Sequence, residues 1–437
     1  MKYFIEIWGC QMNEHDAETL AGLIEKKGFT KSDTIEEADL VVLYTCCIRE
    51  KAEAKVLGRI GALKKIKDKK EGNMITAVGG CMTQQEDVAT MIQKRFKQVD
   101  IIFGTHNLND FDIFLEQKMA NHEGVYAVSK EDSMMIKDQV PMRRADDLKA
   151  YVNIIYGCNN FCSYCIVPYV RGREKSRSIK AIREEVQSLL ANGYKEITLL
   201  GQNVNSYGKD FKDGTDFSML LKELDQLGDY RLRFMSSHPR DFNEALVDTI
   251  SESKNVCPQF HLPVQGGSDS VLKSMNRGYT RDKYLSLVSY IKKVFPEGTI
   301  STDMIVGFPG ETEEDFQDTL DLMEKVGFDQ AYMFIYSVRE GTRAENMPNH
   351  INPEVQKERF DRMLTLQKRK SLERNEAMLG KVYEVLVENK TAKGAMTGRT
   401  LGNKVINFSG SESLIGELVK VKVTDANTWS LFGEIVE

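Results

Sequence analysis

The run YGCNNFCSYCIVP, at residues 156–168, places three cysteines at the spacing Cys-x3-Cys-x2-Cys, namely Cys158, Cys162 and Cys165. Three thiolates at this spacing can hold three irons of a cubic [4Fe–4S] cluster, which needs four ligands in all. One iron is then left for a ligand that the protein does not supply, and an open metal position marks a reactive site. We expect that iron to bind a small molecule through its amino and carboxylate groups.

Two other interpretations of these cysteines stay open. The first is a structural zinc site with its fourth ligand elsewhere, such as one of the six histidines, although the chain has no second Cys-x2-Cys pair. The second is a disulfide framework. Eight cysteines in 437 residues are too few to favour it, and Glu6 interrupts the short apolar start that a secretory signal would need. We therefore expect a reducing cytoplasm, where such cysteines usually bind metal.

The composition is that of a globular protein with two to four domains, because 41% of the 437 residues are hydrophobic and 28% are charged. No apolar run approaches the ~20 residues that a membrane helix needs, so we expect no membrane segment. The net charge of −6 gives no support to nucleic-acid binding by the chain as a whole.

Strand and helix patterns alternate through the N-terminal third of the chain. Strands are expected at residues 3–8, 39–45, 73–80 and 99–105, with helices at 17–27, 49–65 and 86–96. The second helix shows a stripe at Ala52, Val56, Ile60 and Leu63, which is a period of 3.6 residues. This alternation predicts a parallel sheet wound on both faces.

Cysteines follow three of these expected strands: Cys10 the first, Cys46 and Cys47 the second, and Cys81 the third. The carboxyl ends of parallel strands share one edge of the sheet, where ligands bind. We infer a second three-cysteine metal site made of Cys10, Cys46 and Cys81, with Cys47 as the ambiguous member. The alternative is that these are ordinary buried thiols.

The middle of the chain repeats the strand–helix pattern six times. The expected strands lie at residues 151–156, 196–201, 230–236, 259–264, 299–308 and 330–336. Six repeats are fewer than the eight of a closed barrel, so we predict a partial (βα)6 barrel whose side opening admits a large substrate.

Polar residues fall at the carboxyl ends of these strands, where barrel enzymes carry their active sites. With Tyr164 of the cysteine loop, the candidates for holding a small polar cofactor are Gln202, Asn203, Ser237, Gln265 and Asp303. His238 and His261 are expected to be structural. The Gly-rich turn at residues 307–316 is weak evidence for anion binding, because Glu311 and Glu313 look like helix-start carboxylates.

The C-terminal part reads as a long helix at residues 353–379 followed by short alternating strands. The strands at residues 381–388, 403–408, 417–424 and 430–437 predict a small antiparallel β-barrel. Composition leaves open whether this barrel binds RNA or is only structural. A better phosphate-binding candidate is the basic cluster of Arg171, Arg173, Lys175 and Arg177, which follows the cysteine loop.

Motifs along nearly the whole chain resemble the methylthiotransferases of the radical S-adenosylmethionine superfamily. The matching stretches are WGCQMNEHDAE from Trp8, CCIREKAE from Cys46, GGCMTQQE from Gly79, the cysteine run itself, HLPVQGGSDSVLKSMNRGYTR from His261, IVGFPGETEEDF from Ile305 and GRTLGNKVINF from Gly398. The family has Ser where Cys47 stands. The resemblance to the tRNA-modifying branch is specific, and it identifies the C-terminal barrel as a TRAM domain, which binds RNA.

This resemblance implies two [4Fe–4S] clusters and S-adenosylmethionine as cofactors. Cys158, Cys162 and Cys165 would hold the cluster that cleaves S-adenosylmethionine to a radical, and Cys10, Cys46 and Cys81 an auxiliary cluster that carries sulfur. The radical would remove hydrogen from carbon 2 of an isopentenylated adenosine beside the anticodon, and a methylthio group would be delivered there. That carbon is not acidic enough for proton transfer to ordinary side chains.

The expected organisation is an N-terminal α/β domain at residues 1–118, a linker at 119–143, the partial barrel at 144–372 and the TRAM barrel at 373–437. Expected partners are the anticodon loop of tRNA, contacted by Arg171, Arg173 and Arg177, a reducing electron donor such as flavodoxin or ferredoxin, and a sulfur source. We expect a monomer. The alternatives are methylthiolation of threonylcarbamoyl-adenosine or of a ribosomal-protein aspartate, and a non-catalytic, zinc-stabilised RNA-binding scaffold.

Overall fold

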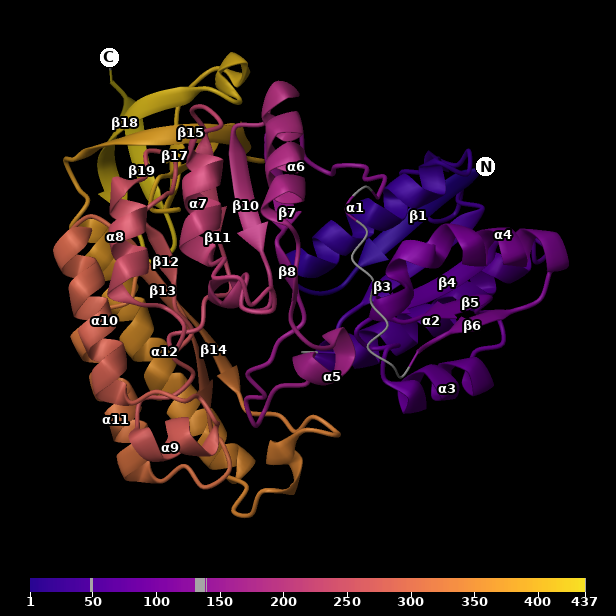
Figure 1. The fold of residues 1–437 in the computed structure, drawn as a ribbon, viewed down its shortest axis with the longest axis horizontal. Coiled ribbons are helices and arrows are strands. Elements are labelled where there is room, and N and C mark those ends of the chain that lie inside the picture. Colours follow the sequence, from indigo (N-terminus) through magenta and orange to yellow (C-terminus); the bar gives the residue numbers. More distant parts are fainter. Residues whose placement is uncertain (48–49, 130–137, 139, 437) are drawn as a thin grey trace.

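The computed structural model describes residues 1–47, 50–129, 138 and 140–436, which form three regions (Figure 1). An N-terminal α/β region lies beside a central region of parallel strands and outer helices. A C-terminal barrel lies over one end of the central region, and the two chain ends are on opposite sides of the molecule. Among the described residues, no helix has the length and apolar character needed to cross a bilayer.

The N-terminal sheet has six parallel strands in the order β2-β1-β3-β4-β5-β6. The strands are β1 (Lys2–Ile7), β2 (Thr30–Lys31), β3 (Leu40–Thr45), β4 (Ile75–Gly80), β5 (Ile101–Phe103) and β6 (Val125–Ala127). The chain starts near the middle of the sheet and changes direction between β1 and β3, which is where open α/β sheets bind ligands. The four predicted strands are present. The short edge strands β2 and β6 were not predicted, and β6 falls in the segment predicted as a linker.

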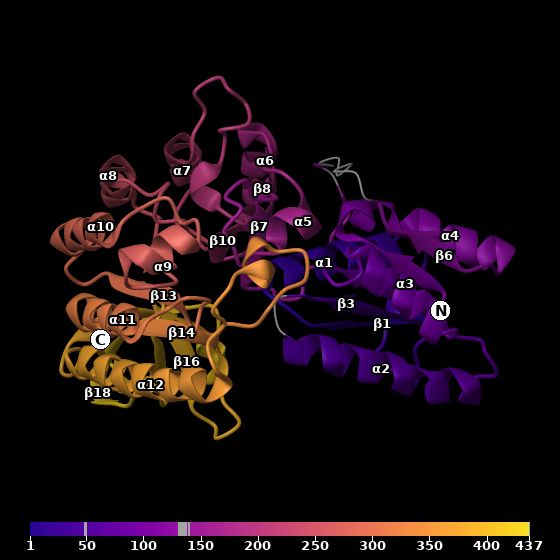
Figure 2. The ribbon, with the colours of Figure 1, turned by 90° about the horizontal axis from the view of Figure 1, so that it is seen from below.

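Helices cover both faces of this sheet, as predicted (Figure 2). They are α1 (Gln11–Glu25), α2 (Glu50–Lys69), α3 (Glu86–Arg95) and α4 (Phe111–Asn121), with a 3-10 turn η1 (Thr105–Asp110) before α4. Leu20 of α1 and Phe111 of α4 pack on the face that carries Val42, whereas Ile60 of α2 and Ile92 of α3 pack on the opposite face. Successive residues of β3 point to alternate faces, so both need an apolar cover. Of the predicted stripe in α2, Ala52 lies outside the residues whose side chains are described.

The central region contains six parallel strands in two three-stranded sheets, β11-β10-β7 and β12-β13-β14. They are β7 (Lys149–Asn153), β10 (Glu196–Leu200), β11 (Arg231–Phe234), β12 (Gln259–His261), β13 (Thr299–Val306) and β14 (Gln330–Ile335). An isolated bridge from Leu232 to Val256 links β11 to the segment that enters β12. The predicted partial barrel of six strand–helix units is confirmed.

Helices on the outside of these strands bury an apolar core and begin at capped positions. They are α6 (Ile179–Ala191), α7 (Phe217–Asp225), α8 (Glu244–Glu252), α9 (Asp269–Ser274), α10 (Arg281–Val294) and α11 (Glu313–Val326). A side-chain oxygen just before each helix accepts a backbone N–H from its first turn. These caps are Ser178, Asp216, Asn243, Ser268, Thr280 and Thr312.

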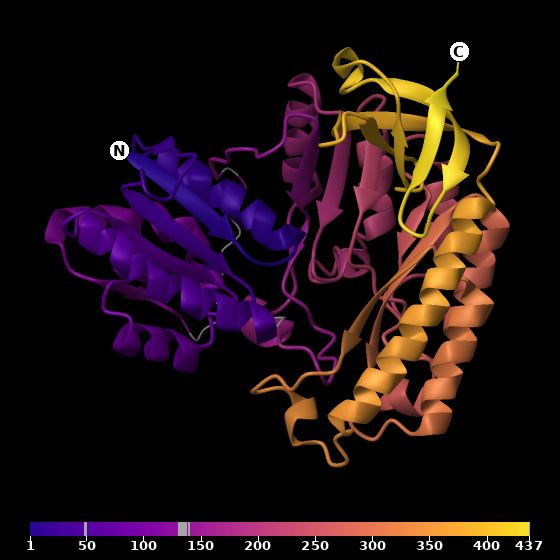
Figure 3. The same ribbon diagram turned by 180° about the vertical axis from the view of Figure 1, so that it is seen from behind.

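The Gly-rich turn at residues 307–316 has a structural role, as the carboxylates there suggested. Glu311 is buried, accepts the Gly307 N–H at 2.8 Å and pairs with Arg359 at 2.8 Å. Arg359 belongs to α12 (Pro353–Glu376), the long helix that packs along β14 (Figure 3). The turn therefore holds α12 against the barrel.

A closed five-stranded barrel follows α12, with the strand order β15-β16-β17-β19-β18. The strands are β15 (Val382–Lys390), β16 (Met396–Thr400), β17 (Val405–Phe408), β18 (Leu418–Ala426) and β19 (Leu431–Ile435). The prediction of a small barrel is confirmed, although β16 was missed and β17 pairs with β19 in parallel, so the barrel is not antiparallel throughout. The sequence of β16, MTGRT, alternates too weakly to indicate a strand.

The C-terminal barrel sits at the amino ends of the central strands. Arg231 of β11 donates to the carbonyl oxygen of Arg399 (2.6 Å), and Arg233 donates to those of Leu401 (2.7 Å) and Thr400 (3.0 Å). The opposite, carboxyl ends of the strands, where active sites of such folds lie, are not covered by this barrel (Figure 1).

Candidate functional site

The first cysteine trio lies in a loop whose backbone is held from several sides. The loop runs from β8 (Ile155–Tyr156) to α5 (Val167–Arg171). The Cys158 N–H donates to the Gly172 carbonyl at 3.1 Å, and the Ser163 N–H donates to the Met275 carbonyl at 3.0 Å. A Cβ on Gly157, where φ is +71°, would come within 2.1 Å of a backbone oxygen, so the loop closes only with glycine there.

The three thiols of this loop lie close enough to influence one another. Burial raises the pKa of Cys158 and that of Cys165 to about 12, and the neighbouring Cys162 adds to both shifts. Cys158 and Cys162 are buried, and Cys165 is partly buried. The structure therefore brings the predicted trio together, in a setting where burial keeps Cys158 and Cys165 as thiols unless a bound metal favours their thiolates.

A buried arginine contacts this trio, and it was not predicted. Nη1 of Arg277 donates to Sγ of Cys162 (3.4 Å) and to the Tyr164 hydroxyl (3.2 Å). His238 lies on the same thiol, with Nε2 4.0 Å from Sγ of Cys162. Its Nδ1 accepts the Arg240 N–H (3.2 Å), so the ring proton is assigned to Nε2. Burial lowers the pKa of His238 to about 2, which keeps the ring neutral.

The second trio is assembled by strand register. Ile7 of β1 pairs with Tyr44 of β3, and Thr45 of β3 pairs with Gly80 of β4, so the three strands end level with one another. The Cys81 N–H donates to the Thr45 carbonyl (3.0 Å), and a Cβ on Gly80 would lie 2.3 Å from that oxygen. The approach of β3 to β4 thus requires glycine beside the cysteine.

Cys47, the ambiguous member, is in contact with Cys81. The two side chains pack together with Ile166 and Val170, and the hydrogen bond from Cys47 is the main cause that lowers the pKa of Cys81 to about 6. Burial raises the pKa of Cys10, which precedes α1, and the nearby Cys81 adds to this shift. Cys46 is buried as well. Cys47 is therefore a candidate third ligand beside the predicted Cys46.

A second buried arginine contacts this trio. Arg171, at the end of α5, donates from Nε to Sγ of Cys81 (3.3 Å) and from Nη2 to Asn13 (2.9 Å) and Asp16 (2.7 Å). The Tyr44 hydroxyl donates to the same oxygen of Asp16 (2.9 Å). The guanidinium of Arg171 thus links α5, which follows the first trio, to Cys81 of the second trio and to Asn13 and Asp16 beside it.

The predicted phosphate contacts of Arg171 and Arg177 must be corrected. Arg171 is only 4% exposed and is occupied by the contacts just described. Arg177 is buried equally deeply, pairs with Glu185 (2.6 Å) and Asp138 (3.0 Å), and donates to the Asn153 carbonyl (2.8 Å). Arg173 alone of the three is exposed, with its guanidinium 4.3 Å from the ring centre of Phe161.

Helix α5 connects the two trios. It begins directly after the first trio, and its residue Val170, with Ile166 just before the helix, packs against Cys47 and Cys81. The Thr105 hydroxyl donates to the Val170 carbonyl, which fixes α5 to the N-terminal region. Figure 1 shows α5 at the junction of the two regions.

Several residues predicted to hold a cofactor carry buried polar atoms with no partner among the described residues. These atoms are Oε1 of Gln202, Oδ1 of Asn203 and Oγ of Ser237. All follow central strands at their carboxyl ends, and such orphaned groups indicate a missing polar ligand. Asn203 is fixed through its Nδ2, which donates to Asp241 at 2.7 Å.

The other two predicted contacts lie on neighbouring strands. Gln265 has φ at +74°, and its backbone bridges to β13 by accepting the Ile305 N–H (2.8 Å) and donating to the Asp303 carbonyl (2.9 Å). The Asp303 carboxylate lies 3.7 Å from His261, whose Nδ1 is 3.0 Å from the Ser301 hydroxyl. His261 therefore has the structural surroundings that were expected.

In the part of the chain that the structure describes, no three His, Cys, Asp or Glu side chains converge closely enough for a single metal ion. The thiolates of a cubic cluster bind different irons at different corners, so they stand further apart than the ligands of one ion. Three thiols are the protein ligands that such a cluster takes when one iron stays open, and each set offers that number.

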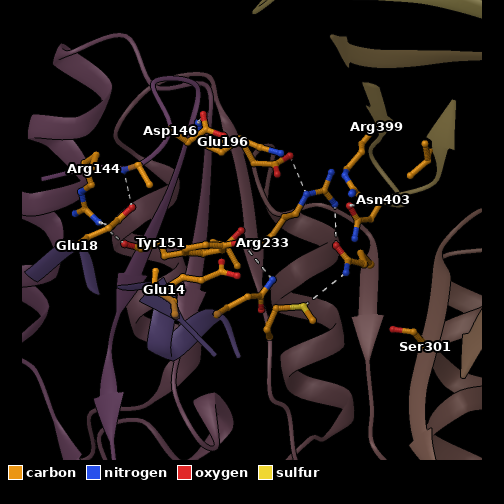
Figure 4. Close-up of a pocket in the computed structure, with 18 of the residues that line it drawn as sticks. Glu14, Glu18, Arg144, Asp146, Tyr151, Glu196, Arg233, Ser301, Arg399 and Asn403 are labelled. Carbon is orange, nitrogen blue, oxygen red and sulfur yellow. Dashed lines mark hydrogen bonds and ion pairs between the residues drawn. The ribbon is translucent and has the colours of Figure 1, made fainter. Parts of the chain in front are cut away.

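A cavity of about 990 Å³ lies along the inner face of the central strands, between α1 and the C-terminal barrel (Figure 4). Glu14 and Glu18 of α1 line one side of it, and Arg233 and Arg399 line another. Arg233 pairs with Glu196 at 2.8 Å. None of the six predicted cysteine ligands lines this cavity, which is bounded on the N-terminal side by residues of β1 and α1.

Three known families match separate parts of the chain. The Radical SAM superfamily matches residues 152–323, the Uncharacterized protein family UPF0004 matches residues 2–104, and the TRAM domain matches residues 376–436.

Curated proteins resemble the chain over its full length. The tRNA-2-methylthio-N(6)-dimethylallyladenosine synthase of Alkaliphilus oremlandii is 51% identical over 439 residues, which span 100% of this chain and 93% of that protein. The protein of the same name from Acetivibrio thermocellus is 52% identical over 437 residues, with 99% and 91% covered. That from Clostridium botulinum is 48% identical over 436 residues, with 99% and 96% covered.

Solved structures share the fold at low sequence identity. The radical S-adenosylmethionine methyltransferase TsrM from Kitasatospora setae, solved with cobalamin and a [4Fe–4S] cluster, has a TM-score of 0.57 at 14% identity, with 79% of this chain and 77% of that chain covered. The radical enzyme OxsB, solved with aqua-cobalamin and S-adenosylmethionine, has a TM-score of 0.51 at 12% identity, with 84% and 56% covered.

Proposed function

The chain belongs to the radical S-adenosylmethionine superfamily and, within it, to the family of the tRNA-2-methylthio-N(6)-dimethylallyladenosine synthases, and we propose that it adds a methylthio group to carbon 2 of N6-isopentenyladenosine in tRNA. The chain is a transferase whose cofactors are two [4Fe–4S] clusters and S-adenosylmethionine. The observation that carries the proposal is the contact of α5, which directly follows the first trio, with the thiols of the second.

The donor sets fit these cofactors. Cys158, Cys162 and Cys165 would hold the radical cluster, and Cys10 and Cys81, with Cys46 or Cys47, the auxiliary cluster. Each set offers three thiols, so one metal position in each site stays available to another ligand. When bound, these groups supply a radical able to remove hydrogen from an unreactive carbon, and the sulfur that replaces it.

The two buried arginines hold one thiol in each site. A guanidinium N–H that donates to sulfur favours the thiolate over the thiol, and it fixes the side-chain rotamer. Arg277 fixes the rotamer of Cys162 and also orients Tyr164. Arg171 fixes the rotamer of Cys81, helps to lower the pKa of that thiol, and is itself held by Asp16 and Asn13. Neutral His238 adds an N–H directed at Cys162 without adding charge.

Residues at the strand ends would bind the substrate of the radical site. The unpartnered atoms of Gln202, Asn203 and Ser237 can hydrogen-bond the polar groups of S-adenosylmethionine, and Gln265 and Asp303 lie on adjacent strands. Burial of these groups excludes water, which would otherwise quench a reactive intermediate.

The tRNA is the macromolecular substrate, and its anticodon loop is the part we propose to enter between the trios. Unpaired loop bases can be splayed out and read individually, unlike bases in a helix. The reaction needs a reducing electron donor, such as flavodoxin or ferredoxin, and a sulfur source. We propose a monomer that acts in the cytoplasm.

Nucleoside analysis of tRNA from cells that lack the gene tests this function. The methylthiolated form of isopentenyladenosine should disappear and its unmodified precursor should accumulate, and the intact gene should restore the modification whereas a Cys162→Ala gene should not. An unchanged level of the methylthiolated nucleoside would contradict the proposal. Loss of methylthiolated threonylcarbamoyl-adenosine instead would assign the chain to the other tRNA substrate.

A further inference from the structure

An exposed group of two aromatic rings and one guanidinium borders the first cysteine trio. Phe161 lies inside the cysteine loop, Tyr169 lies in α5, and Arg173 follows α5. The rings of Phe161 and Tyr169 are 5.9 Å apart at 89°, and the guanidinium of Arg173 lies 4.3 Å from the centre of the Phe161 ring. We call these three residues the Phe161 patch.

The patch is exposed although it is largely aromatic. Tyr169 is 47% exposed, Arg173 is exposed, and Phe161 is partly buried. Exposed single apolar residues are common, but an edge-to-face aromatic pair with a guanidinium over one ring, beside a reactive loop, suits a binding surface. None of the roles assigned above to the trios uses these side chains.

The backbone under the patch is fixed. Phe161 has φ at +47°, in the left-handed region that a bulky residue rarely adopts. Its carbonyl accepts the Asn276 side-chain N–H at 3.0 Å, and Cys162 follows directly. Such conformations persist where the surroundings hold them, and they concentrate at binding and active sites. The Phe161 ring is therefore presented in one orientation by the same loop that carries the thiols.

The patch lies on the segment that leads from the first trio to the contacts with the second. The side of α5 that carries Val170 packs against Cys47 and Cys81, and Arg171 reaches Cys81. Tyr169, on the same short helix, is directed to solvent. A nucleotide that reaches the space between the trios therefore has its neighbours in the loop close to this patch.

The chemistry of the patch suits a nucleobase better than a phosphate. Unpaired bases of RNA stack on aromatic rings and on guanidinium planes, and this contact needs no sequence-specific partner. Phosphate binding relies on several cations together, but Arg171 and Arg177 of this segment are buried in ion pairs. The guanidinium of Arg173 already lies against the Phe161 ring, which extends the stacking surface.

We propose that the Phe161 patch is a stacking platform for an unpaired base next to the target adenosine in the tRNA loop. The proposal rests on the proposed function, because it takes tRNA as the substrate. It adds a binding site for the base next to the target adenosine. Binding of that neighbouring base would help to position the target nucleotide at the reactive site.

Binding of an anticodon stem-loop RNA to the iron-loaded protein under anaerobic conditions tests the platform. The probe RNA contains isopentenyladenosine, with 2-aminopurine as the adjacent base. Tyr169→Ala should weaken binding about 10-fold, the loss of one base–aromatic stack. Tyr169→Phe keeps the ring and should bind as the unaltered protein does. Tyr126→Ala is the matched control, because Tyr126 is 37% exposed but lies on β6 at the edge of the N-terminal sheet.

Two further readouts separate stacking from a structural role. The fluorescence of 2-aminopurine should be quenched on binding to the unaltered protein and to Tyr169→Phe, and less so with Tyr169→Ala. Affinities are compared at equal iron content per chain, so that a damaged cysteine loop is not counted as lost stacking. Arg173→Ala should weaken binding by a similar factor at low and high salt, whereas a phosphate contact would lower the salt slope by about 1.

The outcomes distinguish the platform from the proposed function. If the unaltered protein binds the RNA and Tyr169→Ala binds it as tightly, with the same quenching, the platform is wrong and the function stands. A weaker dependence of the binding constant on salt concentration for Arg173→Ala would also overturn the platform, because it would show that Arg173 contacts a phosphate. If the unaltered protein does not bind the RNA at all, the proposed function fails.

Discussion

The two cysteine trios are built in opposite ways. Cys158, Cys162 and Cys165 come from one loop, so their spacing along the chain is enough to bring them together. Cys10, Cys81 and the cysteines after β3 come from three strand ends, and only the register of β1, β3 and β4 makes them neighbours. The first site depends on a short segment, and the second depends on the whole N-terminal sheet.

Both trios nevertheless share one device, a buried arginine that donates to a thiol. Arg171 and Arg277 each precede a glycine in the left-handed region, Gly172 at φ +75° and Gly278 at φ +72°. Both arginine side chains are buried, each 4% exposed. The two arginines differ in their partners, since Arg171 pairs with Asp16 whereas Arg277 contacts phenol and carbonyl oxygens.

The largest expected effect separates the roles of the two trios. Cys162→Ala should reduce S-adenosylmethionine cleavage to background and with it all methylthiolation. Cys81→Ala should retain cleavage and lose sulfur insertion, because the radical trio is untouched. The products 5′-deoxyadenosine and methylthiolated nucleoside are measured in the same reaction. Normal methylthiolation by Cys81→Ala would show that the second trio has no part in the reaction.

A second pair of variants identifies the third ligand of the auxiliary site. Cys47 contacts Cys81, whereas the family resemblance points to Cys46. Of Cys46→Ala and Cys47→Ala, one should lose about half of the bound iron and all sulfur insertion, and the other should keep both. Iron content and methylthiolation are measured on each variant. Full retention in both would mean that either thiol can substitute for the other.

A third prediction compares the two arginines through stability. Arg171→Met leaves the Asp16 carboxylate buried without its cation, which should cost about 3–5 kcal/mol. Arg277→Met removes hydrogen bonds but leaves no buried carboxylate without its cation, and it should lower the free energy of unfolding by about 1–3 kcal/mol. Urea unfolding of the cluster-free protein is followed by far-UV circular dichroism, because the two arginines lie in different regions and this signal reports on all of the helices.

The control for this comparison is the double variant Asp16→Asn with Arg171→Met. It removes both charges and should recover part of the loss of Arg171→Met. Equal costs for Arg171→Met and Arg277→Met, with no recovery in the double variant, would refute the distinction drawn between the two arginines.

The smallest effect concerns the interface that holds the auxiliary site against the barrel. Burial lowers the pKa of His15 in α1 from 6.5 to about 4, with Glu185 and Asp16 opposing this shift and Arg144 and Arg177 assisting it. His15 has the higher pKa in the unfolded chain, so the unfolded chain takes up a proton at a higher pH than the folded chain does. The free energy of unfolding therefore falls as the pH drops from 6.5 toward 4. This group should contribute a loss of about 2 kcal/mol by about pH 5.

His15→Gln removes the titrating group and should make the free energy of unfolding less dependent on pH over this range. Urea unfolding of both proteins at pH 6.5 and at about pH 5 gives the difference. An identical pH dependence in the two proteins would show that His15 is not the group that titrates.

Much of this organisation could be predicted from the sequence because it rests on local patterns. The Cys158 loop, the six strand–helix units and the C-terminal barrel all follow from spacing and periodicity. The short strands β2, β6 and β16 could not be found, since two or three residues, or a weakly alternating run, carry too little signal.

The site was harder to predict where charged side chains are buried, because the sequence does not show which partners they pair with. Arg171 and Arg177 looked like phosphate ligands because the segment is rich in cations. The partner of Arg171, Asp16, is 155 residues away in sequence, and the partner of Arg177, Glu185, lies on the following helix α6. Only the folded structure pairs them. Arg277 went unnoticed for the same reason, since its partner Cys162 is 115 residues away.

The most direct test of two separate clusters is the iron content of the anaerobically purified protein. The intact chain should hold about eight irons and negligible zinc, and replacing either trio by alanine should leave about four, with the spectrum of one [4Fe–4S] cluster. Zinc in place of iron would contradict the account. So would an intact chain with about four irons, if replacing one trio removed all of them and replacing the other trio removed none.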